Sequence, residues 1–233
     1  MGFRLDGNNS LKLATSSVLT TLGWAHDGSQ LMYADNSGGE SRAMIVGADG
    51  HNLHQIEYIE GFVSWGIFSA DDKALYLSTL SGNSKLSVWK AHPDGSQVQK
   101  LLENCGNIAD SSLDGERLLG LKDEGEDVGI YQVSVKDKQC IPLLPGMATS
   151  GAHYSPDGKA VLYPVTSHGQ VTFYRQVIQG DKPVGKPQVA LKLPFNFPLD
   201  YNGNAFDFSP DLSTIVYARP GGQADFYKLT LPQ

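Results

Sequence analysis

Short apolar runs separated by polar turns recur along the whole chain, and none of them has the period of a helix. Five segments share one order: a polar stretch that contains an aspartate, a turn residue, and then an apolar run. They are Trp24–Tyr33, Phe68–Leu77, Ser111–Leu119, Tyr154–Tyr163 and Phe208–Tyr217. Within the first three repeats, a second polar turn joins two further apolar runs. The pattern predicts an all-β fold with four short strands in each repeat.

The spacing between the aspartates of these turns gives the length of the repeat. The aspartates are Asp27, Asp71, Asp114, Asp157 and Asp211. The successive spacings are 44, 43, 43 and 54 residues, and a period near 43 is typical of the four-stranded blades of a β-propeller. We attribute the longer last interval to a turn enlarged by residues 180–187 and a loop enlarged by residues 194–198.

The turn residues explain the repeat and carry a resemblance. Asp-Gly between two apolar runs favours a hairpin, because glycine adopts a positive φ at little cost. The segment Ser155-Pro156-Asp157-Gly158-Lys159 and its degenerate copies resemble the repeat of TolB-type propellers, which are relatives of the WD repeat. The resemblance covers essentially the whole chain and implies a β-propeller. It implies little about function, because propellers serve many unrelated functions.

The repeats divide the chain into a single five-bladed domain over residues 1–233. The predicted blades are 22–63, 64–108, 109–149, 150–203, and a composite of 204–231 with 1–20. In the composite blade, the N-terminal segment supplies the outer strand and the C-terminal segment the inner strands, which hides the edges of the sheet. The alternative is that the chain is an arc of a larger ring, cut from a longer protein.

Composition and charge narrow the classes of partner. The net charge is −7, and the 18 basic residues form no run, which argues against nucleic acid. Neither a secretory leader nor an apolar stretch of 18 residues is found, so we expect no membrane insertion. The expected compartment is the cytoplasm, or the periplasm or another extracytoplasmic space if the chain is cut from a membrane-anchored parent. A closed ring would be a monomer.

Two cysteines are too few for a disulfide framework. Cys105 is placed near the end of the fourth strand of the second predicted blade, and Cys140 at the beginning of the fourth strand of the next blade. At about 3.3 Å per residue, most of a strand length separates them. We therefore expect both to be free thiols.

Two groups of residues are candidates for binding. The loops between blades and those between the second and third strands form one rim of a propeller, here called the loop rim, and this rim carries exposed aromatic and polar residues that suit a protein or a small polar ligand. A second group occupies equivalent positions on the innermost strands, where carboxylates and an imidazole could face the channel. Aromatic residues of the rim could instead pack between blades, and the inner polar residues could bond the backbone. The candidates are Arg42, Tyr58, Trp65 and Tyr201 on the rim, and Asp110, His153 and Asp207 on the inner strands.

Catalytic and cofactor motifs are absent from the sequence: it contains no G-x-S-x-G, P-loop, H-E-x-x-H or dinucleotide fingerprint. The prediction is a non-catalytic binding scaffold without a metal or a cofactor. The resemblance implies that such propellers serve as sensor or scaffold regions of bacterial serine/threonine kinases and winged-helix regulators. Two alternatives remain: a five-bladed glycosidase that uses channel carboxylates, and the propeller gate of a serine peptidase whose hydrolase domain is missing.

Overall fold

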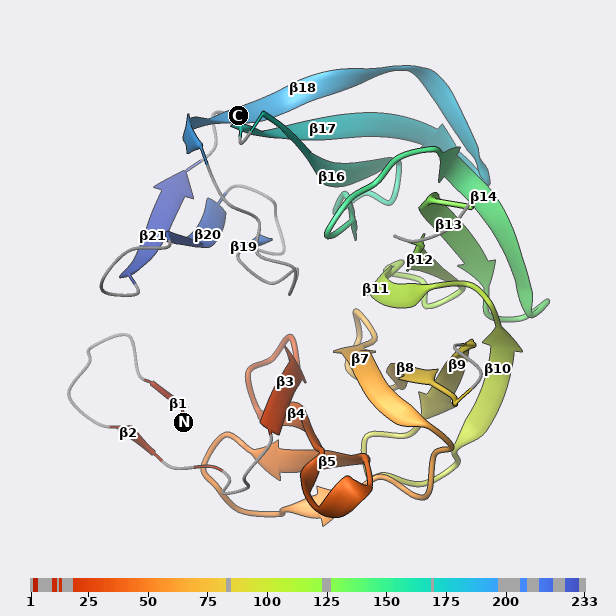
Figure 1. Cartoon of the computed structure of the whole chain (residues 1–233), viewed down its shortest axis with the longest axis vertical. Helices are drawn as coiled ribbons and strands as arrows, with labels where there is room; N and C mark the ends of the chain where they lie inside the picture. The colour runs from red at the N-terminus through yellow and green to blue at the C-terminus, as the bar shows by residue number, and fades with distance from the viewer. Residues whose placement is uncertain are drawn as a thin grey trace. The chain divides into compact units, whose positions relative to one another are not determined.

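The architecture is almost entirely β, as the sequence predicts. The computed structural model describes residues 2–3, 10–11, 13, 19–82, 85–122, 127–168, 170–196, 206–208, 214–219 and 225–230. Within these ranges the helical element is a single 3-10 turn, η1 (Ser37–Gly39). Four sheets have four antiparallel strands each (Figure 1). Each of these sheets is called a blade below.

In every blade, neighbouring strands follow one another in the sequence, which is the order that short turns between apolar runs produce. Blade 1 contains β3 (Leu19–Trp24), β4 (Gln30–Asp35), β5 (Arg42–Gly47) and β6 (His54–Gln55). Blade 2 contains β7 (Phe62–Phe68), β8 (Leu75–Leu80), β9 (Leu86–Ala91) and β10 (Gln99–Glu103). Blade 3 contains β11 (Asn107–Ser111), β12 (Arg117–Lys122), β13 (Gly129–Ser134) and β14 (Gln139–Pro145). Blade 4 contains β15 (His153–Tyr154), β16 (Ala160–Ser167), β17 (Gln170–Gln179) and β18 (Lys182–Asn196).

Two smaller sheets come from the terminal segments. Strands β1 (Gly2–Phe3) and β2 (Ser10–Leu11) pair with each other. Strands β19 (Phe206–Phe208), β20 (Thr214–Arg219) and β21 (Asp225–Thr230) form a three-stranded sheet. Much of the predicted composite blade lies outside the described residues, so its closure by the N-terminal segment and the number of blades stay predictions.

The turns between the first two strands of blades 2, 3 and 4 are held by a repeated pair of side-chain hydrogen bonds. In blade 4, the Ser155 hydroxyl donates to Asp157 Oδ1 at 2.7 Å and accepts from the backbone nitrogen of Ala160 at 2.8 Å. This hydroxyl is the main cause that lowers the pKa of Asp157. Gly158 follows with φ of +66°, a conformation that glycine adopts without steric cost. Blades 2 and 3 repeat the bonds with Ser69 and Asp71 and with Ser112 and Asp114.

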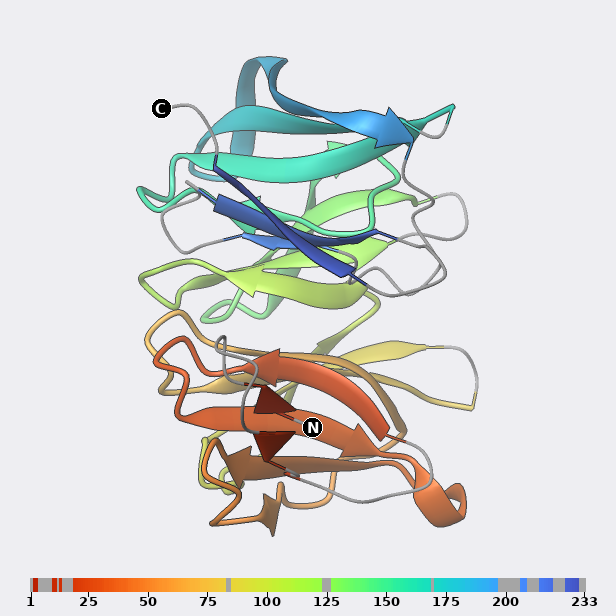
Figure 2. The same ribbon diagram turned by 90° about the vertical axis from the view of Figure 1, so that its left-hand side faces the viewer.

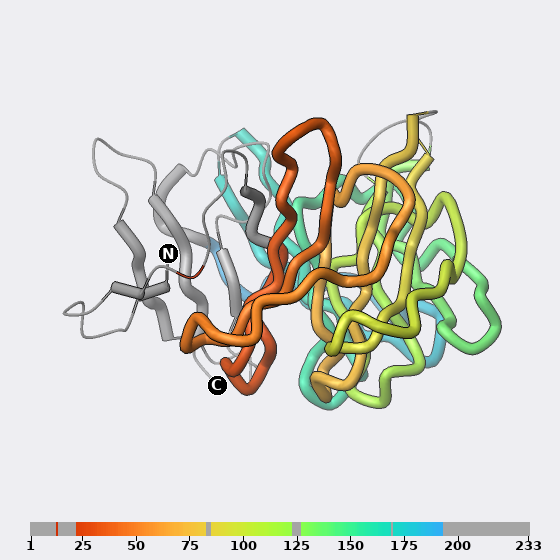
Figure 3. Tube along the Cα trace, turned by 90° about the horizontal axis from the view of Figure 1, so that it is seen from below, coloured from red at the N-terminus to blue at the C-terminus, as the bar shows by residue number. Residues whose placement is uncertain are grey.

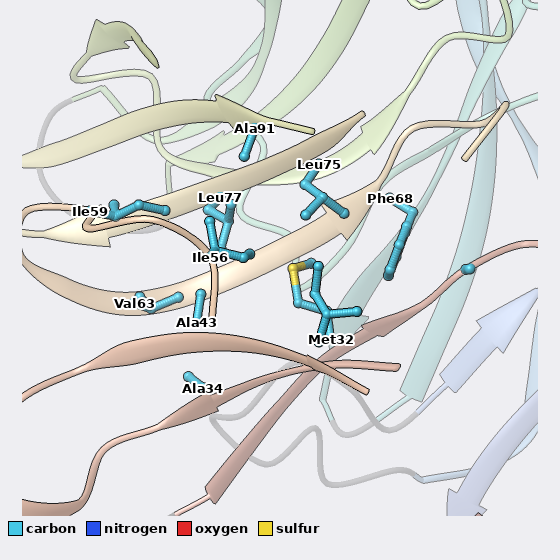
Figure 4. Packing of buried hydrophobic residues seen from close by; sticks show 12 residues of the cluster. Met32, Ala34, Ala43, Ile56, Ile59, Val63, Phe68, Leu75, Leu77 and Ala91 are labelled. Carbon is cyan, nitrogen blue, oxygen red and sulfur yellow. The ribbon is translucent and has the colours of Figure 1, made fainter. Parts of the chain in front are cut away.

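The chain divides into two compact units, one of residues 1–120 with 133–140 and one of residues 121–132 with 141–233. The core of the first unit joins blades 1 and 2, and its residues Met32, Leu75 and Leu77 (Figure 4) are completely buried, as is Ile45. In the second unit, the ring of Tyr163 stacks on that of Tyr174, with centroids 5.9 Å apart. Apolar residues at alternate positions of strands, such as Leu75 and Leu77, thus form the core of the first unit.

The predicted enlarged turn at residues 180–187 is wrong. Gln179 pairs directly with Lys182, so the turn contains only two residues, and Gly180 has φ of +65°. Residues 182–187 belong instead to β18, which lies beside β17 at the edge of its sheet (Figure 2). An edge strand tolerates Pro183 and Pro187, because the missing N–H groups can face away from the neighbouring strand.

The expectation of two free thiols is also wrong, because Cys105 and Cys140 form a disulfide with Cα atoms 5.9 Å apart. Residues Asn104 and Gly106 on either side of Cys105 have positive φ values of +60° and +77°, so the chain changes direction there. It then approaches β12 at Gly120, where an added Cβ atom would lie 2.2 Å from the carbonyl oxygen of Cys105. A count of residues along extended strands misses this change of direction.

Candidate functional site

A cavity of about 480 Å³ lies in blade 1 where the β4–β5 loop meets the segment leading into blade 2. Both segments belong to the classes of loop that the sequence analysis assigns to the loop rim. The β4–β5 loop and the segment between β6 and β7 both belong to the orange part of the trace (Figure 3). We call this cavity and its edge the rim cavity. Its lining residues are Gly39, Glu40, Ser41, Arg42, Ala43, Gln55, Ile56, Glu57, Tyr58, Ile59, Gly61 and Phe62.

The floor of the rim cavity is part of the hydrophobic core. Ala43, Ile56 and Ile59 line the cavity, and each is at least 94% buried. Figure 4 shows them among the residues that join blades 1 and 2. The backbone nitrogen of Ile56 also donates to the carbonyl of Ala43 at 2.9 Å. A well-packed floor of this kind is a fixed support for the exposed residues around it.

Two aromatic side chains stand at the edge of the cavity and face solvent. Tyr58 is 81% exposed and Phe62 is 49% exposed. Phe62 begins β7 and pairs with Leu80, which is itself 40% exposed. Gly61 allows this pairing, because its φ is +97° and an added Cβ atom would lie 2.9 Å from the carbonyl oxygen of Leu80. Exposed aromatic residues grouped beside a cavity are typical of a binding surface.

Hydrogen bonds fasten the β4–β5 loop to its surroundings. The Ser41 hydroxyl donates to Asn36 Oδ1 at 2.6 Å and accepts from the backbone nitrogen of Val63 at 2.8 Å. The loop of blade 1 is thereby joined to the first strand of blade 2. Both segments that line the cavity are therefore positioned relative to each other by backbone and hydroxyl contacts.

Carboxylates outnumber cationic side chains in the lining of the cavity. The guanidinium of Arg42 lies 3.6 Å from Asp35 Oδ2, and the two residues are paired across β4 and β5. Its Nε atom is buried and has no hydrogen-bond partner among the described residues. Glu40 and Glu57 also line the cavity; both are exposed, and within the described part of the chain neither forms an ion pair. The lining thus carries two carboxylates beyond the Arg42–Asp35 pair.

The other rim candidates have different positions. Trp65 lies in β7 opposite Ser78, is half-buried, and does not line the rim cavity. Tyr201 lies outside the described residues.

That the three candidates on the inner strands face the channel together stays a prediction. Asp110 lies in β11, where its Oδ1 atom accepts from the backbone nitrogen of Ser111 at 2.8 Å. His153 lies in β15 and Asp207 in β19, and the side chain of Asp207 lies outside the described part. No group of three metal-ligating side chains occurs within the described ranges.

Sequence reasoning named Arg42 and Tyr58 but missed the two carboxylates that accompany them. Glu40 follows η1 and Glu57 follows β6, so a strand count assigns both to ordinary polar loops. No strand-like alternation marks them, because in residues 56–59 the buried Ile56 and Ile59 lie on either side of the two exposed residues Glu57 and Tyr58.

Comparison with solved structures identifies the fold. TolB from Acinetobacter baumannii superposes with a TM-score of 0.71 at 17% identity, over 97% of this chain and 55% of that protein. A putative TolB from Agrobacterium tumefaciens gives 0.64 at 15% identity, over 92% of this chain and 82% of that one. The propeller domain of the Trilobed protease from Pyrococcus furiosus gives 0.55 at 15% identity, over 91% and 68%.

The chain therefore spans about half the length of the first of these proteins. Neither a family model nor a curated protein matches the sequence. In the described part of the structure, no helix has the length and apolarity needed to cross a membrane. Four-stranded antiparallel blades in series, together with these superpositions, establish that the chain has the fold of a TolB-like β-propeller.

Proposed function

We propose that this propeller is a non-catalytic binding module that recognises a polypeptide through the rim cavity. One observation carries the proposal: the exposed aromatic ring of Tyr58 stands at the edge of a cavity whose floor is core and whose walls are loop-rim segments. Such a combination provides apolar contact area on a rigid support, which is what stable recognition requires.

The hydrogen bond of Asp110 is compatible with a structural role for this residue in place of a catalytic one. Acid–base chemistry on a sugar needs carboxylates that face the substrate at a set separation. Asp110 was one of the candidates, and its carboxylate bonds the backbone of the adjacent residue. A structural role of this kind is the common one for a half-buried polar group.

Site-specific photo-crosslinking tests the proposal. A photoreactive amino acid in place of Tyr58 should give discrete adducts in cells that make the protein, and the additional substitution Phe62→Ser should remove them. The matched control is the same amino acid in place of Leu113, which is 62% exposed in an Asp-Gly turn. Equal adducts from both positions, or adducts that Phe62→Ser does not change, would show that the rim cavity is not the binding surface.

A further inference from the structure

The negative charge of the rim cavity and the apolar surface beside it together select a class of partner. This inference rests on the function proposed above. The guanidinium of Arg42 has Asp35 as its counter-charge at 3.6 Å. Glu40 and Glu57 remain without a cation among the described residues. The site is therefore locally negative, within a protein whose net charge is −7. A long-range field of the same sign attracts cationic ligands toward it.

The exposed ring of Tyr58 also favours a cationic ligand. Tyr58 is 81% exposed and lies in the chain directly beside Glu57. An ammonium or guanidinium group can lie over the face of such a ring and gains about 0.5–1 kcal/mol at an exposed site. The phenol ring and the neighbouring carboxylate thus favour the same ligand group.

The rest of the surface is apolar. Phe62 and Leu80 are paired across β7 and β8, and both remain exposed beside the cavity edge. An isolated exposed apolar residue is common, but two paired ones beside an exposed tyrosine form a patch that water solvates poorly. A ligand that covers this patch contributes apolar side chains of its own.

From these observations we propose that the occupant of the rim cavity is a basic polypeptide segment, in which lysine or arginine residues lie close to apolar ones. The basic side chain contacts Glu40, Glu57 and the ring of Tyr58, and the neighbouring apolar side chain covers Phe62 and Leu80. Charge and apolar area then act on the same segment, which gives selectivity against acidic and against purely polar segments.

Fluorescence anisotropy with three synthetic peptides tests the proposal. The first peptide has capped ends, two lysines and two leucines, the second has glutamates in place of the lysines, and the third has serines in place of the leucines. The first should bind, the second should not, and the third should bind less tightly. Raising the salt concentration from about 0.05 to 0.5 M should weaken binding of the first peptide, because exposed charges are screened.

Variants of the protein distinguish the effect of carboxylates at the cavity from the effect of the protein's net charge. Glu40→Gln combined with Glu57→Gln should weaken binding of the lysine peptide about tenfold, equivalent to about 1.4 kcal/mol. Tyr58→Ala should weaken it about threefold and Tyr58→Phe should restore it, because the ring is kept. The control is Glu116→Gln with Asp181→Asn, which removes the same charge from exposed residues elsewhere and should leave the affinity unchanged.

The outcomes distinguish this inference from the function on which it rests. Preference for the glutamate peptide, or equal affinities in the Glu40→Gln, Glu57→Gln variant and its control, would overturn the inference. So would the failure of all three peptides to bind. If crosslinked adducts at position 58 still form in any of these cases, the binding function stands and only the class of partner is wrong.

Discussion

The carboxylate of Asp72 in blade 2 holds His26 in the turn of blade 1. Its Oδ1 atom accepts from the backbone nitrogen of His26 at 2.8 Å and lies 2.9 Å from the ring nitrogen Nδ1 of the same residue. Its Oδ2 atom accepts from the backbone nitrogen of Asp27 at 3.0 Å. Asp72 has φ of +57°, at the position that glycine occupies in the turn of blade 4 at Gly158. The side chain thus makes a link between blades that glycine could not make.

Replacing Asp72 with glycine should lower the free energy of unfolding by about 1–2 kcal/mol, measured by urea denaturation. Glycine relieves the positive φ, so the loss reports the hydrogen bonds to His26 and Asp27. The matched control is Gly158→Asp, where φ is +66° and an added Cβ atom meets nothing within 4 Å. That variant should lose about 1 kcal/mol from the backbone alone. A gain of stability in Asp72→Gly would contradict the proposed role of the link.

Reduction of the disulfide should lower the free energy of unfolding by about 3–4 kcal/mol. The bridge joins residues 35 positions apart, and closing a loop of this length restricts the unfolded chain. Thermal melting with and without a phosphine reductant measures the loss, and Cys140→Ser should show it without reductant. The denatured, unreduced protein should titrate no thiol. Two titrated thiols would refute the bridge.

The same bridge gives a test of the expected compartment. Disulfides persist in oxidising compartments and are reduced in the cytoplasm. A cytoplasmic setting predicts that Cys105 and Cys140 are both alkylated when cells are lysed into a thiol reagent. An extracytoplasmic setting predicts that both are protected. Mass spectrometry of the peptides that contain these residues distinguishes the two outcomes.

Alanine substitutions at two glycines distinguish the stability cost of backbone strain from that of steric contact. Gly95 has φ of +84°, and an added Cβ atom would lie 2.8 Å from the carbonyl oxygen of Gln55, whereas Gly158 has a similar φ and open space. Gly158→Ala should lower the free energy of unfolding by about 1 kcal/mol. Gly95→Ala should lower it by about 2–4 kcal/mol, because strain and displacement of the neighbouring backbone add. Equal losses in urea denaturation would show that the approach to Gln55 is easily relaxed.

Acid should destabilise the turn of blade 2. The Ser69 hydroxyl donates to Asp71 and, with the backbone nitrogen of Lys73, lowers the pKa of that carboxyl from its ordinary 3.8 to about 2. A carboxyl whose pKa is lower in the folded state contributes stability above the unfolded pKa, near 4, and this contribution is lost as the pH falls toward 2. Urea denaturation between pH 6 and pH 2 should show the decline.

A matched pair of serines isolates the contribution of this turn. Ser69→Ala should reduce the decline of stability between pH 4 and pH 2, in addition to any loss at neutral pH from the bond to Ala74. The control Ser81→Ala removes a hydroxyl that bonds the carbonyl of Lys85, and it should leave the pH dependence unchanged. Parallel pH curves for wild type and Ser69→Ala would count against the assigned cause.

The sequence was sufficient for the blades because their signals are local. An apolar run beside Asp157 and Gly158 predicts a hairpin whatever the rest of the chain does. The disulfide depends instead on the direction that Asn104 and Gly106 give the backbone, and residue spacing contains no such information. The carboxylates of the rim cavity were missed for a similar reason, since Glu40 and Glu57 are 17 residues apart in the sequence and line the same cavity only in the folded chain.

The outer edge of blade 1 offers few unused backbone groups to a strand from another molecule. Strand β6 has only two residues, and beyond it the backbone nitrogens of Ile56 and Glu57 already donate to the carbonyls of Ala43 and Gly95 at 2.9 and 2.8 Å. Pairing with a strand from another molecule needs a row of unused backbone groups. Residues 54–57 offer too short a row, so blade 1 resists strand exchange, and the recognition proposed for the rim cavity would depend on side chains.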